Sequence, residues 1–75
     1  MALSDTDRAI LEFESRAPRN VSAKEEAIRG ELGLTPMRYL YRLNQLIDDP
    51  EAASEFPMLI NRLARIRHGH ANIRK

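Results

Sequence analysis

The middle of the chain gathers side chains whose hydrogen-bonding groups match those of nucleic acid. On a helix that begins at Thr35, the side chains turned away from the apolar stripe are Met37, Arg38, Tyr41, Arg42 and Gln45. Arginine can pair with a guanine edge through two hydrogen bonds, and glutamine can pair with adenine. The hydroxyls of threonine and tyrosine can bond phosphate, and methionine can contact the methyl group of thymine. These residues, with Thr35, therefore predict contact with duplex DNA.

A second basic cluster lies near the end of the sequence. Residues 56–75 hold five basic side chains, two histidines and no acid: Arg62, Arg65, Arg67, Arg74 and Lys75, with His68 and His70. If the last helix packs beside the helix that begins at Thr35, Arg62 and Arg65 can bind backbone phosphates. Each such contact makes the affinity for DNA more dependent on salt. Alternatively, both clusters are solvated helix surface, with Tyr41 covering an edge of the core.

The remaining titratable residues do not form a catalytic or metal-binding pattern. His68 and His70 fall on different faces of a helix and have no third ligand nearby in sequence. The five glutamates between residues 12 and 31 are typical of an exposed helix surface, and no nucleophile arrangement or phosphate loop accompanies them. We therefore expect no enzyme, no metal and no cofactor.

Composition predicts one soluble domain that spans residues 1–75. Hydrophobic residues make up 43% of the chain and charged residues 31%, with a formal net charge of +1. Residues 1–34 hold five basic and seven acidic side chains, whereas residues 35–75 hold seven basic and four acidic ones, so basic charge is local. The chain has no cysteine, no signal-peptide pattern and no long apolar run, which favours a cytoplasmic protein without membrane contact.

Local start and stop signals predict the helices in the first half. Ser4, followed by two aspartates, favours a helix that runs to about Arg16, before the break at residues 17–20. The capping box at residues 22–25 favours a second helix that reaches Leu32, with Ala27, Ile28 and Leu32 turned inward. Gly33 then follows as a left-handed stop.

The second half predicts a long helix, a short turn and a last helix. Thr35 and Pro36 favour a helix to about Asp48 whose inward residues are Tyr39, Leu40, Leu43, Leu46 and Ile47. A short turn at residues 50–53 precedes a helix over residues 57–68, with Leu59, Leu63 and Ile66 inward. We expect residues 1–3 and 69–75 to fray. The fold class is therefore all-α, a small bundle of about four helices.

Residues 22–48 have the organisation of a helix-turn-helix unit. Two helices are joined by the tight turn Gly33, Leu34 and Thr35, and the unit places the first turns of its second helix against base edges in the major groove. This organisation predicts that the helix beginning at Thr35 is a recognition helix.

The chain also resembles a family of short actinobacterial proteins classed as a domain of unknown function. The resemblance rests on LSDTDRAILEFE, SAKEEAIRGELGLTPMRYLYRLNQLIDDPEA and FPMLINRLARIR, and covers roughly residues 3–67. It implies an actinobacterial or actinophage origin and a helix-turn-helix-like fold, but no activity.

The central segment is also similar to the promoter-reading domain of sigma factors. Gly33, Leu34 and Thr35 match its turn, and Tyr39 and Leu43 match the inward positions of its recognition helix. Arg29 departs from the pattern, because the position four before the glycine usually holds a small residue. This arginine implies either a wider helix crossing or a side chain that reaches outward.

Two functions remain open at this point. The leading hypothesis is a DNA-binding accessory or transcriptional regulatory protein that uses the helix at Thr35, with double-stranded DNA as its partner. One small unit binds weakly, so a homodimer or a larger partner is expected. The alternative is a protein-interaction module that binds a protein, such as one of the transcription machinery, through Met37, Leu40 and Tyr41.

Overall fold

The computed structural model describes the backbone of residues 3–73 and the side chains of residues 3–67. This part of the chain is helical without a strand, as predicted. The elements are α1 (Asp5–Arg16), α2 (Val21–Ala27), the π-helical turn η1 (Ile28–Leu32), α3 (Pro36–Ile47), α4 (Pro50–Glu55) and α5 (Pro57–Ile73). Within the described range, no helix combines the length and the apolar composition needed to span a membrane.

Helix α1 begins and ends at the predicted residues. The Ser4 hydroxyl accepts a hydrogen bond from the amide of Asp7 at 3.1 Å, and the acidic side chains of the first turn face the positive end of the helix. Ala17 has extended backbone angles because it precedes Pro18, so the helix stops at Arg16.

Helix α2 begins at Val21, two residues earlier than a Ser22 cap predicts, and the Ser22 capping box is wrong. The cap is Asn20, whose Oδ1 accepts a hydrogen bond from the amide of Ala23 at 2.9 Å. Asparagine is as good a cap as serine, and Asn20 already has the extended backbone that a cap requires. Ser22 therefore lies inside the first turn.

The turn between α2 and α3 follows the prediction at Gly33 but contains a π-helical segment before it. Gly33 has φ of 67°, the left-handed conformation that glycine adopts without a steric penalty. In η1 the side chain of Ile28 is buried, whereas Arg29 is exposed. The arginine thus reaches outward, and Leu34 after the glycine packs against the core.

Helix α3 has the predicted start, but one of its inward residues is wrong. The Thr35 hydroxyl accepts a hydrogen bond from the amide of Arg38 at 3.2 Å, and Pro36 occupies the first turn. The buried line consists of Tyr39, Leu43 and Leu46, whereas Leu40 is exposed. Leu40 lies about 100° around the helix from Tyr39, outside the strip that α1 covers.

The last two helices differ from the prediction in length. The expected turn at residues 50–53 is helix α4, which Asp49 caps by accepting from the amide of Glu51, so the described chain has five α-helices instead of four. Helix α5 continues to Ile73, five residues beyond the predicted end. Leu59 is buried as predicted and Ile60 is buried beside it, whereas the prediction that Ile66 points inward is wrong, because its side chain is exposed.

Leu3 lies in the segment that we expect to fray, and its side chain is buried in the core. Residues 1–2 and 74–75 lie outside the described range.

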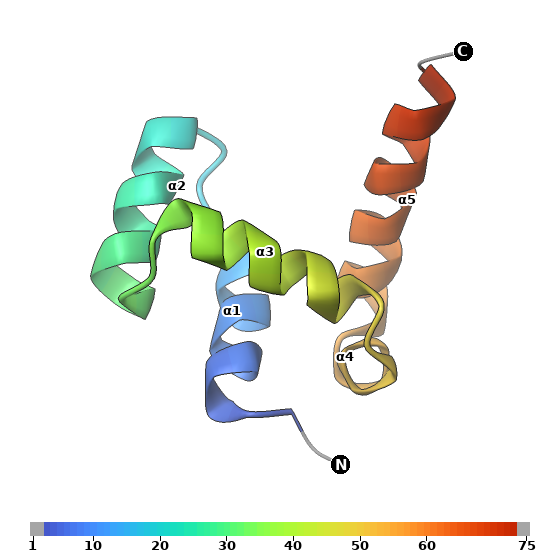
Figure 1. Ribbon diagram of the computed structural model, residues 1–75, viewed down its shortest axis with the longest axis horizontal. Helices are drawn as coiled ribbons and strands as arrows, with labels where there is room; N and C mark the ends of the chain where they lie inside the picture. The colour runs from blue at the N-terminus through green and yellow to red at the C-terminus, as the bar shows by residue number, and fades with distance from the viewer. Residues whose placement is uncertain (1–2, 74–75) are drawn as a thin grey trace.

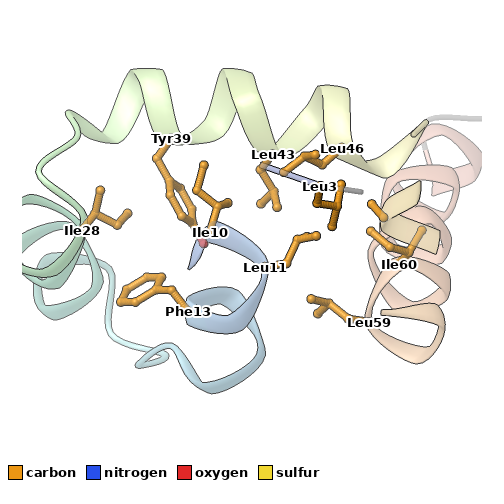
Figure 2. Packing of buried hydrophobic residues seen from close by; sticks show 11 residues of the cluster. Leu3, Ile10, Leu11, Phe13, Ile28, Tyr39, Leu43, Leu46, Leu59 and Ile60 are labelled. Carbon is orange, nitrogen blue, oxygen red and sulfur yellow. The ribbon is translucent and has the colours of Figure 1, made fainter. Parts of the chain in front are cut away.

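The core forms around α3, which packs against α1, η1, α4 and α5 (Figure 1). Figure 2 shows the buried side chains of α3 directed toward those of α1, with Ile28 at one end and the α5 residues at the other. The rings of Phe13 and Tyr39 meet edge to face, with centroids 5.7 Å apart. One side of α3 is therefore buried in the core, and this burial determines which residues of α3 face the solvent.

Candidate nucleic-acid interface

The side of α3 that points away from the core carries three of the predicted DNA-contacting residues. Met37 is 76% exposed, Tyr41 is 68% exposed, and Arg38 is exposed and makes no ion pair within the described part of the chain. We call Met37, Arg38 and Tyr41 the outer face of α3. Thr35 lies at its beginning, where its oxygen caps the helix and its hydroxyl hydrogen stays available to a phosphate.

Arg42 differs from the prediction, because its guanidinium is bound to another helix. Its Nε and Nη2 donate to the two carboxylate oxygens of Asp7 at 2.7 and 2.6 Å. Its Nη1 donates to Oε1 of Gln45 at 2.7 Å. An adenine contact would need that Gln45 oxygen. Arg42 therefore holds α1 against α3, whereas Gln45 is exposed and its amide group can still donate hydrogen bonds.

The Asp7–Arg42 pair shifts the protonation of both groups. The hydrogen bonds from Arg42 lower the pKa of Asp7 more than burial raises it. The same hydrogen bonds raise the pKa of Arg42. Both groups are therefore charged at neutral pH, and the positive charge of Arg42 is neutralised locally.

The two predicted arginines of α5 lie on a different surface. Arg62 and Arg65 line a hollow of about 350 Å³ together with Met58, Leu59 and Ser15. Arg62 also lines a larger hollow of about 690 Å³ that Leu40 of α3 borders. Leu40 and Arg42 are two residues apart, about 200° around the helix. The arginines of α5 therefore share the Leu40 side of α3 and do not extend the side that carries Arg38 and Arg42.

The other basic residues of the C-terminal cluster add no free charge to the outer face of α3 in the described part of the chain. Arg67 is paired, since its Nη2 lies 2.9 Å from a carboxylate oxygen of Asp48 at the end of α3. The described part of the structure does not include the side chains of His68 and His70, nor any part of Arg74 and Lys75. The expectation that the two histidines do not bind a metal therefore lies outside the described residues.

Sequence reasoning missed two exposed arginines as candidate site residues. Arg19, in the loop before α2, and Arg29, in η1, make no ion pair within the described residues. Turn η1 packs against α3, so Arg29 lies on an element that contacts this helix. For Arg29 the sequence held a signal: a long side chain lies four positions before Gly33, where a small residue is usual.

A partly buried polar cluster joins α1, α2 and α3. The Tyr39 hydroxyl donates a hydrogen bond to Glu14, and Lys24 Nζ lies 2.9 Å from the same carboxylate and 5.7 Å from the centre of the Tyr39 ring. Burial, and then the bond to Glu14, raise the pKa of the Tyr39 phenol. In the described chain no buried side-chain polar atom lacks a partner, and no three potential ligands gather as a metal site. This cluster acts as a structural brace.

Comparison with known proteins places the sequence in a family. A family model described as a protein of unknown function, DUF3263, matches residues 2–75. The chain belongs to this family. The match agrees with the resemblance to a domain of unknown function, and the description of the DUF3263 family names no activity. No curated protein and no solved structure matches this DUF3263 chain.

Proposed function

We propose that this DUF3263 chain binds duplex DNA through the outer face of α3, as an accessory or regulatory protein of transcription. The observation that supports the proposal is the contrast between the two sides of α3. One side is buried, and the other presents Met37, Arg38 and Tyr41 in the first half of a helix that follows a tight glycine turn. In a helix-turn-helix unit these are the turns that meet base edges.

The proposal assigns α2, η1 and α3 to such a helix-turn-helix unit. Arg38 pairs with a guanine edge, Met37 contacts a thymine methyl group, and the hydroxyls of Tyr41 and Thr35 bond phosphates. Arg29 supplies a phosphate contact from η1. An actinobacterial origin and a cytoplasmic location belong to the same proposal.

The interface is smaller than the sequence predicted, because Arg42 is paired and the α5 arginines lie elsewhere. With a net charge of +1, one unit has little general attraction for a polyanion. We therefore propose that binding in the cell uses a homodimer or a second protein on neighbouring DNA.

Fluorescence anisotropy with a labelled duplex, repeated over a salt series, tests the proposal. Replacing Arg29 by alanine should reduce the slope of log K against log salt by about one, since it removes one phosphate contact. Replacing Arg38 by alanine should weaken binding by about 1–3 kcal/mol, since it removes a guanine contact. Arg65→Ala is the matched control, because it removes an exposed arginine that has no ion pair among the described residues and lies on the other side of α3. The proposal is wrong if no salt-sensitive binding occurs at high protein concentration, or if Arg38→Ala leaves the affinity unchanged.

A second candidate is protein interaction through the same outer face. The exposure of Met37 and Tyr41 favours it, because the two side chains lie one helical turn apart and can together form an apolar contact for a protein partner. A protein of the transcription machinery is the proposed partner. A complex that survives Arg38→Ala but is lost with Met37→Ala plus Tyr41→Ala would favour this function over DNA binding.

A further inference from the structure

A groove runs along the side of α3 opposite to Arg42. Its two hollows, of about 690 and 350 Å³, share Ser15 and Arg62 and therefore adjoin each other. The larger hollow lies between the end of α1, the loop before α2, and the first half of α3. The smaller hollow continues it along α5. We call the two together the α3–α5 groove.

Three large apolar side chains of this groove are exposed. Val21 is 70%, Leu40 57% and Met58 84% exposed, and they come from α2, α3 and α5 respectively. None of them belongs to the hydrophobic core. Apolar residues that gather in a concave surface and are rimmed by charge are typical of a site that a partner covers.

The charge of the groove selects the kind of partner. Three arginines line it without an ion pair in the described chain: Arg19 at the α2 end, and Arg62 and Arg65 along α5. Of the two acids in the lining, Glu14 is bound by Lys24 and by the Tyr39 hydroxyl, which leaves Glu25. The surface is therefore complementary to a partner that combines apolar side chains with carboxylates.

An amphipathic helix fits these features better than other occupants. The described chain offers no strand edge for an added strand, and the apolar positions form a groove of the kind that receives residues spaced one helical turn apart. Nucleic acid fits less well, because Tyr39 is fully buried and the groove offers no exposed aromatic ring for base stacking.

We propose that the α3–α5 groove docks an acidic amphipathic helix of another protein. Apolar side chains of that helix cover Val21, Leu40 and Met58, and its flanking carboxylates pair with Arg19, Arg62 and Arg65. The site shares no residue with the outer face of α3, so the inference stands independently of DNA binding. The chain would thus join an acidic protein segment on one side of α3 to DNA on the other.

A designed peptide tests this proposal with the full chain. The probe is a labelled amphipathic helix with leucines on one face and glutamates on its flanks, and the matched probe has lysine in place of every glutamate. We expect the acidic peptide to shift the backbone NMR signals of Val21, Leu40 and Met58, and the lysine peptide to leave them unchanged. Absence of these shifts, or equal shifts with the lysine peptide, overturns the proposal.

Variants then locate the contact. Leu40→Ser, and Arg62→Ala combined with Arg65→Ala, should each weaken binding of the acidic peptide about tenfold. Both changes are at exposed positions, and circular dichroism checks that the helices remain. Met37→Ala on the outer face is the control and should leave the affinity unchanged.

Two further outcomes would also overturn the proposal. If the chain self-associates and Leu40→Ser abolishes this in sedimentation experiments, the groove binds a second copy. If a DNA duplex shifts the signals of Arg62 and Arg65 in place of the peptide, the groove is a nucleic-acid site.

Discussion

The carboxylate of Asp7 meets the guanidinium of Arg42 at two points, which joins the first turn of α1 to the middle of α3. The side chain of Asp7 is only 9% exposed, whereas that of Arg42 is 43% exposed. A nearly buried charge is stable in a protein only when it is paired and hydrogen-bonded. The pair therefore helps to set how α1 and α3 cross, and with it the direction of the outer face.

The difference in burial predicts unequal effects of breaking the pair from either side. Arg42→Ala leaves an unpaired buried carboxylate and should lower the free energy of unfolding by about 1–3 kcal/mol. Asp7→Asn leaves a guanidinium that water can reach, so it should cost less. Urea denaturation measures both. Arg8→Ala, which breaks the exposed pair with Glu55, is the control and should lower the stability less than Arg42→Ala does. Equal losses for Arg42→Ala and Arg8→Ala would contradict this account.

The same pair predicts a loss of stability in acid. Arg42 lowers the pKa of Asp7 in the folded chain below its ordinary value of 3.8. The stabilisation is therefore complete above pH 3.8 and is lost as the pH falls through the folded pKa. Thermal unfolding across this acidic range should show a smaller decline in Asp7→Asn than in the natural sequence. A decline of the same size in both would mean that other carboxylates cause it.

The buried hydroxyl of Tyr39 predicts a small stability effect and a clear effect at high pH. Tyr39→Phe removes one donor to Glu14 but keeps Lys24, so it should cost about 1 kcal/mol, against about 3–5 kcal/mol for Tyr39→Ala. Folding raises the pKa of this phenol above its ordinary value of 10.0, so its contribution is present below pH 10.0 and lost as the pH rises further.

Absorbance titration of Tyr41→Phe, which leaves Tyr39 as the only tyrosine, checks the behaviour at high pH. Tyrosinate should form only together with the loss of helical circular dichroism. Ionisation of a chain that is still folded would show that the hydroxyl is not buried as described.

The corrected cap of α2 gives a matched pair of substitutions. Asn20→Ala removes the side chain that accepts from the amide of Ala23 and should cost about 1 kcal/mol. Ser22 is exposed inside the first turn, so Ser22→Ala should be nearly neutral. Thermal unfolding compares the two, and the reverse order of effects would restore the capping box at residues 22–25.

The helix starts and the glycine turn were predictable because each depends on atoms close in sequence. Ser4 and Thr35 bond amides three residues ahead, and the φ angle of Gly33 is a property of one residue. The predicted cap of α2 was wrong because Ser22 has a good capping residue, Asn20, two positions before it. The spacing of apolar residues does not distinguish a π-helical turn from an α-helix, so η1 could not be predicted from the sequence.

The candidate site was less predictable because its geometry depends on contacts between distant residues. The period of α3 places Arg42 on its polar side, but the partner of Arg42 is Asp7, 35 residues earlier in the chain. Leu40 is apolar and lies beside the buried line, yet it is exposed because the neighbouring helices form a groove there. Only the packing of α1 and α5 around α3 separates the arginines onto two surfaces.

The Asp7–Arg42 pair finally predicts how α1 restrains the proposed DNA contact. Asp7→Asn frees Arg42, which is one helical turn from Arg38 and on the same side of α3. This variant should bind a duplex more tightly, and its slope of log K against log salt should grow by about one. Asp5→Asn is the matched control, because it removes one negative charge from an exposed residue of the same helix turn. Equal gains in both variants would mean that net charge, not the release of Arg42, causes the effect, and no gain in Asp7→Asn would place Arg42 outside the reach of DNA.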